Sequence, residues 1–345
     1  MNLLLIGNYL SGPGYNHNVW QDLAGHLPKV GFGVITTSSK EKKIPRLLDM
    51  LKTIWLRRND YQIAQIDVFS GQAFIFAECS ARLLRALNKP FILTLNGGNL
   101  PQFSQKHFQR VQQLLTMADA VTAPSMYLLD RMAICRSDIQ LLPNPIEISN
   151  YPFRLRKYPK PAMIWLRAFH HVYNPTMAPR VLANILNDYP TASLVMIGPD
   201  KGDHSLQNTM EVTDHLGVEQ KIKFPGAVLK SEVPMELNQG DVFINTTNFD
   251  NTPTSVVEAM ACGLCVISTN VGGLSYLLND GEDALLVPPD DPVAMGVAAR
   301  RVLSEPGLAE RLSQNGREKA EKLDWANILP LWNSLFMRLI NEYKR

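Results

Sequence analysis

Short apolar runs alternate with amphipathic stretches along the whole chain of 345 residues, and this alternation constrains the fold more than any other feature. Short apolar runs bounded by Gly, Pro or Asn predict buried strands, and the longer periodic stretches between them predict helices. This order is typical of βαβ units and parallel sheets. The strands are expected at 3–7, 33–37, 63–69, 91–95, 120–123 and 139–142, and then at 162–166, 193–197, 221–224, 242–245, 264–268 and 284–287.

The densest proline region, 143–161, lies between these two sets of strands and carries no apolar periodicity. At roughly 150 residues per domain, the length also predicts about two domains. We therefore expect two Rossmann-like, doubly wound α/β domains facing a cleft, an acceptor-side domain at 1–152 and a nucleotide-binding domain at 153–328. A C-terminal helix over 329–345 would be able to pack back on the first domain.

The charge balance argues against a broad nucleic-acid-binding surface, because 34 Lys and Arg nearly cancel 32 Asp and Glu. No apolar run is long enough to cross a bilayer, and the first run lacks the positive start of a signal peptide. We therefore expect a cytoplasmic protein without a nucleic-acid partner.

Metal chemistry has little support in the sequence. Cys262 and Cys265 have the C-x-x-C spacing, but no second pair completes a zinc site, and both lie in an apolar stretch. D-x-D, H-E-x-x-H and P-loop motifs are missing from the sequence. We expect buried thiols and no metal or cofactor.

The stretch 245–260 carries the most chemical information. A predicted buried strand ends in a polar loop, and the loop enters a helix. Asp250 precedes that helix, and Glu258, eight positions later, lies on it. Because a helix N-terminus offers unpaired N–H groups and a positive dipole end, the amides of Thr254 and Ser255 can hold a phosphate.

Two registers compete for the start of this helix. Ser255 and Glu258 match a capping box, in which the glutamate bonds back to the cap. Thr252 and Pro253 match instead an N-cap followed by proline at the first helical position. In the second register Glu258 lies too deep to reach the cap and is free for a ligand. Local physics leaves both registers open.

Several motifs, in order, resemble the family 4 retaining glycosyltransferases of the GT-B fold. The run 250–292 is similar to the family's C-terminal signature, which has an acidic residue, seven residues, Glu-Ala-Met-Ala and then a Val-Gly-Gly turn. Residues 118–125 resemble its ADxVxxxS stretch, and 142–146 resemble its IPNG linker entry. The similarity extends over nearly the whole chain.

This resemblance implies a role for two acidic residues and one arginine. Glu258 matches the acid that holds the donor's ribose, and Asp250 matches the acid that binds donor sugar hydroxyls, where Glu is commoner. Arg167 matches the diphosphate-binding arginine, whose planar fork suits phosphate oxygens. The remaining donor contacts in this half of the chain are expected from Asn251, Thr252, Thr254 and Ser255.

Two positions depart from the family pattern and put the level of activity in question. Val172 stands where the family usually has a lysine, five positions after the arginine. His170, His171 or Lys201 would be the substitutes, although a histidine near its usual pKa of ~6.5 is a poor permanent cation. Asn96 stands where the family often has a histidine, and it can bond hydroxyls but cannot titrate.

Glycines in the first half follow predicted strands and would let the backbone approach the donor diphosphate. Gly12 and Gly14 follow the first strand, and Gly97 follows the fourth, next to Asn96. Alone, the Gly-Pro-Gly sequence at 12–14 is equally typical of an ordinary turn.

Residues 40–58 combine basic and apolar side chains at helical spacing. The apolar positions expected on one face are Leu47, Leu48, Leu51, Ile54 and Trp55. Basic flanks would suit peripheral contact with an anionic membrane and a lipid-linked acceptor. Packing of this face on the sheet explains the pattern equally well.

We therefore expect a metal-independent retaining glycosyltransferase that moves a sugar from a nucleotide-sugar donor to a hydroxyl of a glycan or lipid-linked glycan. A GT-B nucleotide-sugar epimerase or hydrolase would share the fold and would release sugar without an acceptor. A non-catalytic nucleotide-sugar-binding partner would bind the donor without turnover.

Overall fold

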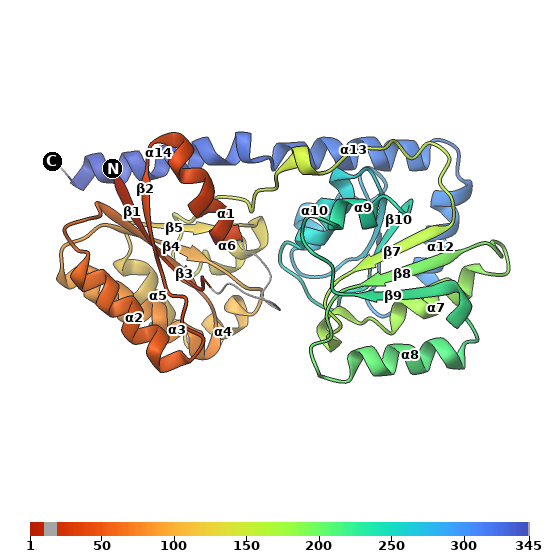
Figure 1. Cartoon of the computed structure of the whole chain (residues 1–345), viewed down its shortest axis with the longest axis horizontal. Coiled ribbons are helices and arrows are strands. Elements are labelled where there is room, and N and C mark those ends of the chain that lie inside the picture. The colour runs from red at the N-terminus through yellow and green to blue at the C-terminus, as the bar shows by residue number, and fades with distance from the viewer. Residues whose placement is uncertain (10–18, 344–345) are drawn as a thin grey trace. The chain divides into compact units, whose positions relative to one another are not determined.

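The computed structural model describes residues 1–9 and 19–343, and the chain divides into two compact units (Figure 1). Unit 1 comprises Met1–Pro145 and Ala326–Arg345, and unit 2 comprises Ile146–Trp325. Each unit is built on one six-stranded sheet in which every strand pair is parallel. The prediction of two Rossmann-like α/β domains is confirmed.

Unit 1 has the strand order β2-β1-β3-β4-β5-β6. Its strands are β1 (Asn2–Ile6), β2 (Gly33–Thr37), β3 (Ile63–Val68), β4 (Phe91–Leu95), β5 (Ala120–Ala123) and β6 (Gln140–Leu141). Its helices are α1 (Val19–His26), α2 (Lys43–Leu56), α3 (Phe74–Ala86), α4 (Leu100–Lys106), α5 (Phe108–Met117), α6 (Met126–Met132) and most of α14 (Trp325–Tyr343). The chain runs from β1 to β2 on one side and then to β3 on the other. A topological switch point, where ligands of such sheets bind, therefore lies between β1 and β3.

Unit 2 has the strand order β12-β11-β10-β7-β8-β9. Its strands are β7 (Ala162–Leu166), β8 (Ser193–Ile197), β9 (Ile222–Gly226), β10 (Val242–Asn245), β11 (Cys265–Thr269) and β12 (Leu285–Val287). Its helices are α7 (Met177–Ile185), α8 (Ser205–His215), α9 (Val233–Leu237), α10 (Thr254–Ala261), α11 (Leu274–Leu277), α12 (Pro292–Ser304) and α13 (Leu308–Lys322). The strand order reverses between β7 and β10, which is the switch point of this sheet.

The sheet of unit 2 is covered on both faces, which explains why its strands read as continuous apolar runs. Successive side chains of a strand point to opposite faces. Along β7, Ile164 therefore joins a core cluster with Val256 of α10, whereas Trp165 joins a second cluster with Val181 of α7. These two cores fix the ends of β7 and β10, where the candidate site lies.

The units divide at 145/146 and 325/326, a few residues before the boundaries expected from the sequence at 152/153 and 328/329. The Ile146 N–H donates to the Leu323 carbonyl at 2.9 Å, and Tyr151 is buried in a core of unit 2. The proline-rich segment after residue 145 thus already belongs to unit 2.

Helix α14 packs on unit 1 after leaving unit 2 at Trp325. The ring of Phe336 meets Phe32 edge-on, with centroids 5.9 Å apart. Near the end of the helix, the Arg85 guanidinium donates to the Tyr343 hydroxyl at 2.9 Å.

Helix α2 buries only part of the apolar face that the sequence predicts over 47–55. Ile54 is buried together with Met50. Ile44, Leu48 and Trp55 are instead 75%, 61% and 50% exposed, and their spacing places them on one stripe. Met50 and Ile54 pack on the domain, whereas the side chains of Ile44, Leu48 and Trp55 are left exposed. None of the helices in the described part of the chain has both the length and the apolar character needed to span a membrane.

Candidate functional site

The acidic residues and the arginine predicted from the sequence gather at the switch point of unit 2. Arg167 follows β7 directly, and Asp250 lies in the loop after β10. Glu258 lies on α10, the helix that this loop enters. Because β7 and β10 are parallel neighbours, their carboxyl ends meet at one edge of the sheet.

Arg167 forms an ion pair with Asp250, and the two side chains are only 15% and 13% exposed. The guanidinium also lies over the ring of Tyr173, 4.2 Å from its centroid. Burial lowers the pKa of Arg167, while Tyr173 and Glu258 act in the opposite direction. Its Nε donates to no described residue, so one arm of the fork is unused.

Glu258 is held by two residues that the sequence did not indicate. Its Oε1 accepts a hydrogen bond from the Tyr151 hydroxyl at 2.8 Å and forms an ion pair with Lys230. Glu258 is 3% exposed, whereas the side chain of Lys230 is 55% exposed. This carboxylate thus already has two partners within the protein, because the segment after residue 145 and the loop before α9 both reach it.

Helix α10 begins at Thr254, with Pro253 at the N-cap and no side-chain cap hydrogen bond. Ser255 therefore lies inside the first turn, so the capping-box register is wrong, and the register with Thr252 at the N-cap begins the helix one residue too early. Its hydroxyl is buried and bonds to none of the described residues. The first amides of such a helix lack intrahelical acceptors, so the turn presents donors next to Asp250.

A glycine turn fixes the path of the loop that carries Asp250. The Gly273 N–H donates to the Asp250 carbonyl at 2.9 Å. A Cβ added at Gly272, where φ is +55°, would lie 2.1 Å from that carbonyl oxygen, and one at Gly273 would lie 1.8 Å from the Asn251 carbonyl oxygen. Only glycine fits this close approach of two backbones.

Val172 supplies its backbone where the resemblance expected a charged side chain. Its carbonyl accepts from the Asn248 N–H at 2.8 Å and from the Thr247 hydroxyl at 3.3 Å. These bonds tie the loop after β7 to the loop after β10.

The expected substitutes for the missing lysine have other contacts. The His171 N–H donates to the Asp203 carboxylate at 2.8 Å, and His170 Nδ1 accepts from the Val172 N–H at 3.3 Å. His170, His171 and Asp203 offer three metal-ligand atoms within 4.8 Å of one another. A neutral His170 whose Nδ1 accepts a hydrogen bond carries its proton on Nε2, however, and then has no free ring nitrogen for a metal. Among the described residues, neither histidine nor Lys201 bonds to Arg167 or Glu258. Lys230 is the cation that the fold brings there.

The other predicted donor contacts fall into three groups. The Asn251 N–H donates to the Asp250 carboxylate at 2.8 Å, and Thr252 is half-buried in the same loop. Asn96 and Gly97 lie in unit 1, directly after β4. Gly12 and Gly14 lie outside the described residues.

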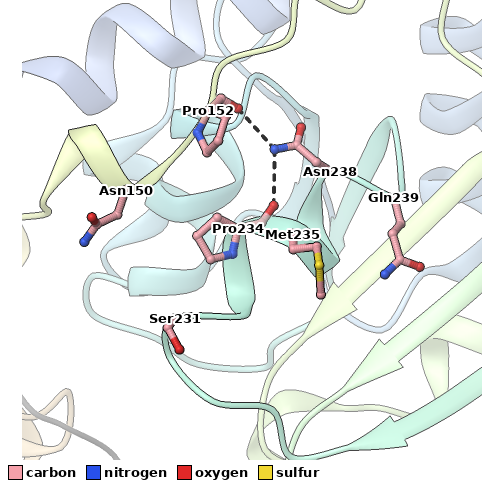
Figure 2. Close-up of a pocket in the computed structure, with 7 residues that line it drawn as sticks. All are labelled: Asn150, Pro152, Ser231, Pro234, Met235, Asn238 and Gln239. Atoms are coloured by element: carbon pink, nitrogen blue, oxygen red, sulfur yellow. Dashed lines mark hydrogen bonds between the residues drawn. The ribbon is translucent and has the colours of Figure 1, made fainter.

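A shallow pocket of about 490 Å³ lies between the linker and the segment around α9 (Figure 2). Asn238 forms part of its wall and donates to the carbonyls of Pro152 and Pro234. Asn150 and Ser231 also line it, and they are the sequence neighbours of Tyr151 and Lys230. None of the residues predicted as donor contacts is among the described residues that line this pocket.

Residues 148–319 match the family model described as glycosyl transferases group 1, and this range covers nearly all of unit 2. Unit 2 is a group 1 glycosyltransferase domain. Over 181 residues the chain is 25% identical to the D-inositol 3-phosphate glycosyltransferase of Streptomyces bingchenggensis. This alignment covers 50% of this chain and 40% of that protein. The chain thus spans less than half of this curated relative.

Solved structures resemble the chain beyond the group 1 domain. The sucrose-phosphate synthase of Thermosynechococcus elongatus has a TM-score of 0.82 at 17% identity, covering 99% of both chains. HepE of Anabaena, solved in complex with UDP-glucose, has a TM-score of 0.77 at 14% identity, covering 98% of this chain and 100% of that one. These likenesses show that the fold is GT-B.

Proposed function

We propose that this chain is a retaining glycosyltransferase, similar to family 4, that moves a sugar from a nucleotide-sugar donor to an acceptor hydroxyl. The observation that carries the proposal is the convergence of Arg167, Asp250 and Glu258 at the switch point of a group 1 domain. The HepE complex with UDP-glucose supports a uridine nucleotide as the first donor to test.

The geometry supports a division of roles among these groups. Arg167 and the first amides of α10 bind the diphosphate and stabilise the charge that develops as it leaves. Asp250 bonds the donor sugar, and Glu258 accepts bonds from the ribose hydroxyls. The anomeric carbon loses its bond to the diphosphate oxygen and gains one to the acceptor oxygen on the same face, and the acceptor proton passes to the diphosphate. This chemistry calls for neither a metal nor a further cofactor, because the guanidinium and the amides supply the positive charge.

Lys230 supplies the second cation that the resemblance places at position 172. Its ammonium reaches Glu258, and the charge of Glu258 partly opposes the lowering of the Arg167 pKa by burial. We therefore assign Lys230 to the binding of the nucleotide's charged part, in place of the lysine that Val172 replaces.

A thermal-shift screen with UDP, GDP and ADP tests the proposed donor class. A nucleotide that binds only the folded domain at about 100 times its Kd adds about 2.7 kcal/mol, which raises the Tm by roughly 5 to 10 °C for a domain of this size. We expect the largest rise with UDP. No rise with any of the three nucleotides would contradict the proposal.

Turnover with UDP-sugars and a panel of glycan acceptors then separates the three candidate activities. Transfer that requires an acceptor, with the anomeric configuration of the donor retained, supports the proposed function. Release of free sugar without an acceptor would favour an epimerase or hydrolase, and binding without turnover would favour a non-catalytic partner.

We also propose that α2 contacts an anionic membrane surface where a lipid-linked acceptor would lie. Its exposed stripe of Ile44, Leu48 and Trp55 combines with the exposed Lys40, Lys42 and Lys52, and a stripe of this kind buries its apolar side chains among lipid headgroups. Basic flanks match the charge of anionic lipids.

Sedimentation with vesicles tests this contact. Binding to vesicles containing phosphatidylglycerol should exceed binding to phosphatidylcholine alone, and Leu48→Gln with Trp55→Gln should weaken it about tenfold or more, because each apolar side chain loses its burial. The matched control changes two exposed valines of α12, Val293→Gln with Val297→Gln, and should bind as wild type does. Equal binding by both double variants would exclude the contact.

A further inference from the structure

Unit 1 has its own polar cluster at the carboxyl edge of its sheet, at the switch point between β1 and β3. Asp67 lies near the end of β3, Asn96 follows β4 directly, and Gly7 follows β1 directly. These three strands are parallel neighbours, so the three residues lie at one edge. Ligands of open parallel sheets bind at such a point.

The Asp67 carboxyl is buried and satisfied on one side only. Its Oδ1 accepts hydrogen bonds from Gln65 Nε2 at 2.9 Å and from Asn96 Nδ2 at 3.3 Å. Its Oδ2 bonds to no described residue, although the side chain is only 6% exposed. A buried polar atom left in this state is costly, and native proteins rarely carry one without a reason.

The absence of a side chain at Gly7 leaves room for the unpaired Asp67 oxygen. A Cβ added at Gly7 would lie 2.2 Å from Asp67 Oδ2, so any other residue there would displace the carboxyl. No described residue forms an ion pair with Asp67, and burial raises its pKa to about 8. The group is therefore largely protonated at neutral pH.

The proton of the neutral acid belongs on Oδ2, because Oδ1 already accepts two N–H donors. Asp67 thus presents a buried O–H donor that lacks an acceptor among the described residues. The chemistry that completes it is a neutral oxygen such as a sugar hydroxyl, since an anion would face no cation here.

We propose that Asp67, positioned by Gln65 and Asn96, binds a hydroxyl of a neutral sugar at the β1/β3 switch point of unit 1, as part of the acceptor site. This inference rests on the proposed glycosyltransferase function, to which it adds the class of acceptor and the residue that receives it.

Saturation-transfer NMR with methyl α-glucoside, methyl α-galactoside and methyl α-mannoside tests the proposal without knowledge of the natural acceptor. At least one glycoside should give a signal with the wild-type protein, and Asp67→Ala should lower that signal about tenfold. The control Asp60→Asn changes an exposed aspartate of the same unit and should leave the signal unchanged. No signal in the wild type, or an equal signal in Asp67→Ala, would overturn the proposal.

The pH dependence supplies a readout that a purely structural role would not change. The wild-type signal should fall as the pH rises through about 8, because ionisation removes the O–H donor. Tyr9 is the other titratable group that faces Asp67 in the described part of unit 1, and burial raises its pKa well above its usual value, so it stays neutral in this range. Asp67→Asn keeps the shape of the side chain and should abolish the pH step. A step that persists in Asp67→Asn would refute the assignment.

The Glu258→Gln variant separates failure of this inference from failure of the proposed function. That residue lies in unit 2, so glycoside signals should survive while the response to UDP is lost. If the wild-type protein binds glycosides through Asp67 but binds no nucleotide, the sugar site is supported and the proposed transferase function is refuted.

Discussion

Replacing Glu258 by glutamine abolishes the rise in Tm that UDP produces and leaves the Tm of the unliganded protein nearly unchanged, if the carboxylate holds the ribose. Each hydrogen bond from a ribose hydroxyl to a carboxylate contributes about 1.5 to 3 kcal/mol, so loss of two such bonds should lower the affinity for UDP about hundredfold or more. Titration of UDP by thermal shift and by calorimetry measures both quantities.

The unliganded protein should tolerate this change because glutamine keeps an oxygen for the Tyr151 hydroxyl. Lys230 loses its ionic partner, but its side chain is 55% exposed and remains hydrated. We expect a change in the free energy of unfolding within about 1 kcal/mol. A large fall in the unliganded Tm with UDP binding intact would mean that Glu258 serves the fold.

Two further variants sharpen this experiment. Lys230→Ala leaves the Glu258 carboxylate in place and removes one exposed cation. It should weaken the binding of UDP by a smaller factor than Glu258→Gln does. Glu211→Gln, on the exposed side of α8, removes the same charge elsewhere in the group 1 domain and should behave as wild type does.

Replacing Arg167 by lysine should lower kcat/KM for sugar transfer about hundredfold. Lysine keeps the charge beside Asp250, but it cannot present the parallel N–H donors that match a diphosphate. Loss of one preorganised donor to a developing negative charge typically costs a hundredfold or more in rate, so the effect should fall on the chemical step. Steady-state kinetics with saturating acceptor measures it.

The choice of lysine avoids a problem of stability that alanine would create. Arg167→Ala would leave Asp250 largely buried without its cation, which can destabilise a protein by about 3 to 5 kcal/mol. Arg301→Lys, which changes an exposed arginine on α12 that pairs with Glu305, is the matched control. Wild-type kcat/KM in Arg167→Lys would remove this arginine from the proposed mechanism.

Many strands could be predicted closely because both sheets are parallel and their central strands are buried along their length. β2, β4, β5, β7, β8 and β10 coincide with the predicted ranges. A buried strand is a continuous apolar run, and the polar or glycine residue at its end marks where the chain leaves the sheet. Arg167 directly follows β7 and Asp250 lies in the loop after β10, but the role of Arg167 was expected from the family resemblance and not from this signal.

Partners distant in the chain carried no comparable signal. Tyr151 lies 107 positions before Glu258, and Lys230 lies in a loop without periodicity, so only the fold reveals that both reach one carboxylate. Asp67 lies inside the strand predicted at 63–69. A single polar residue near the end of a strand is common, so the sequence did not indicate a site there. Apolar spacing alone also does not say which side chains of α2 find a partner, so the sequence left open which of them stay exposed.

The glycine turn at Gly272 and Gly273 positions the backbone of Asp250 without contacting its side chain. The turn holds the loop through main-chain atoms, so this constraint on the loop is the same whichever side chain stands at residue 250. A longer or shorter acid at this position would be delivered from the same starting point, its reach differing by one methylene. Under the role proposed for Asp250, selectivity among donor sugars can then change by single substitutions at this position while the turn stays as it is.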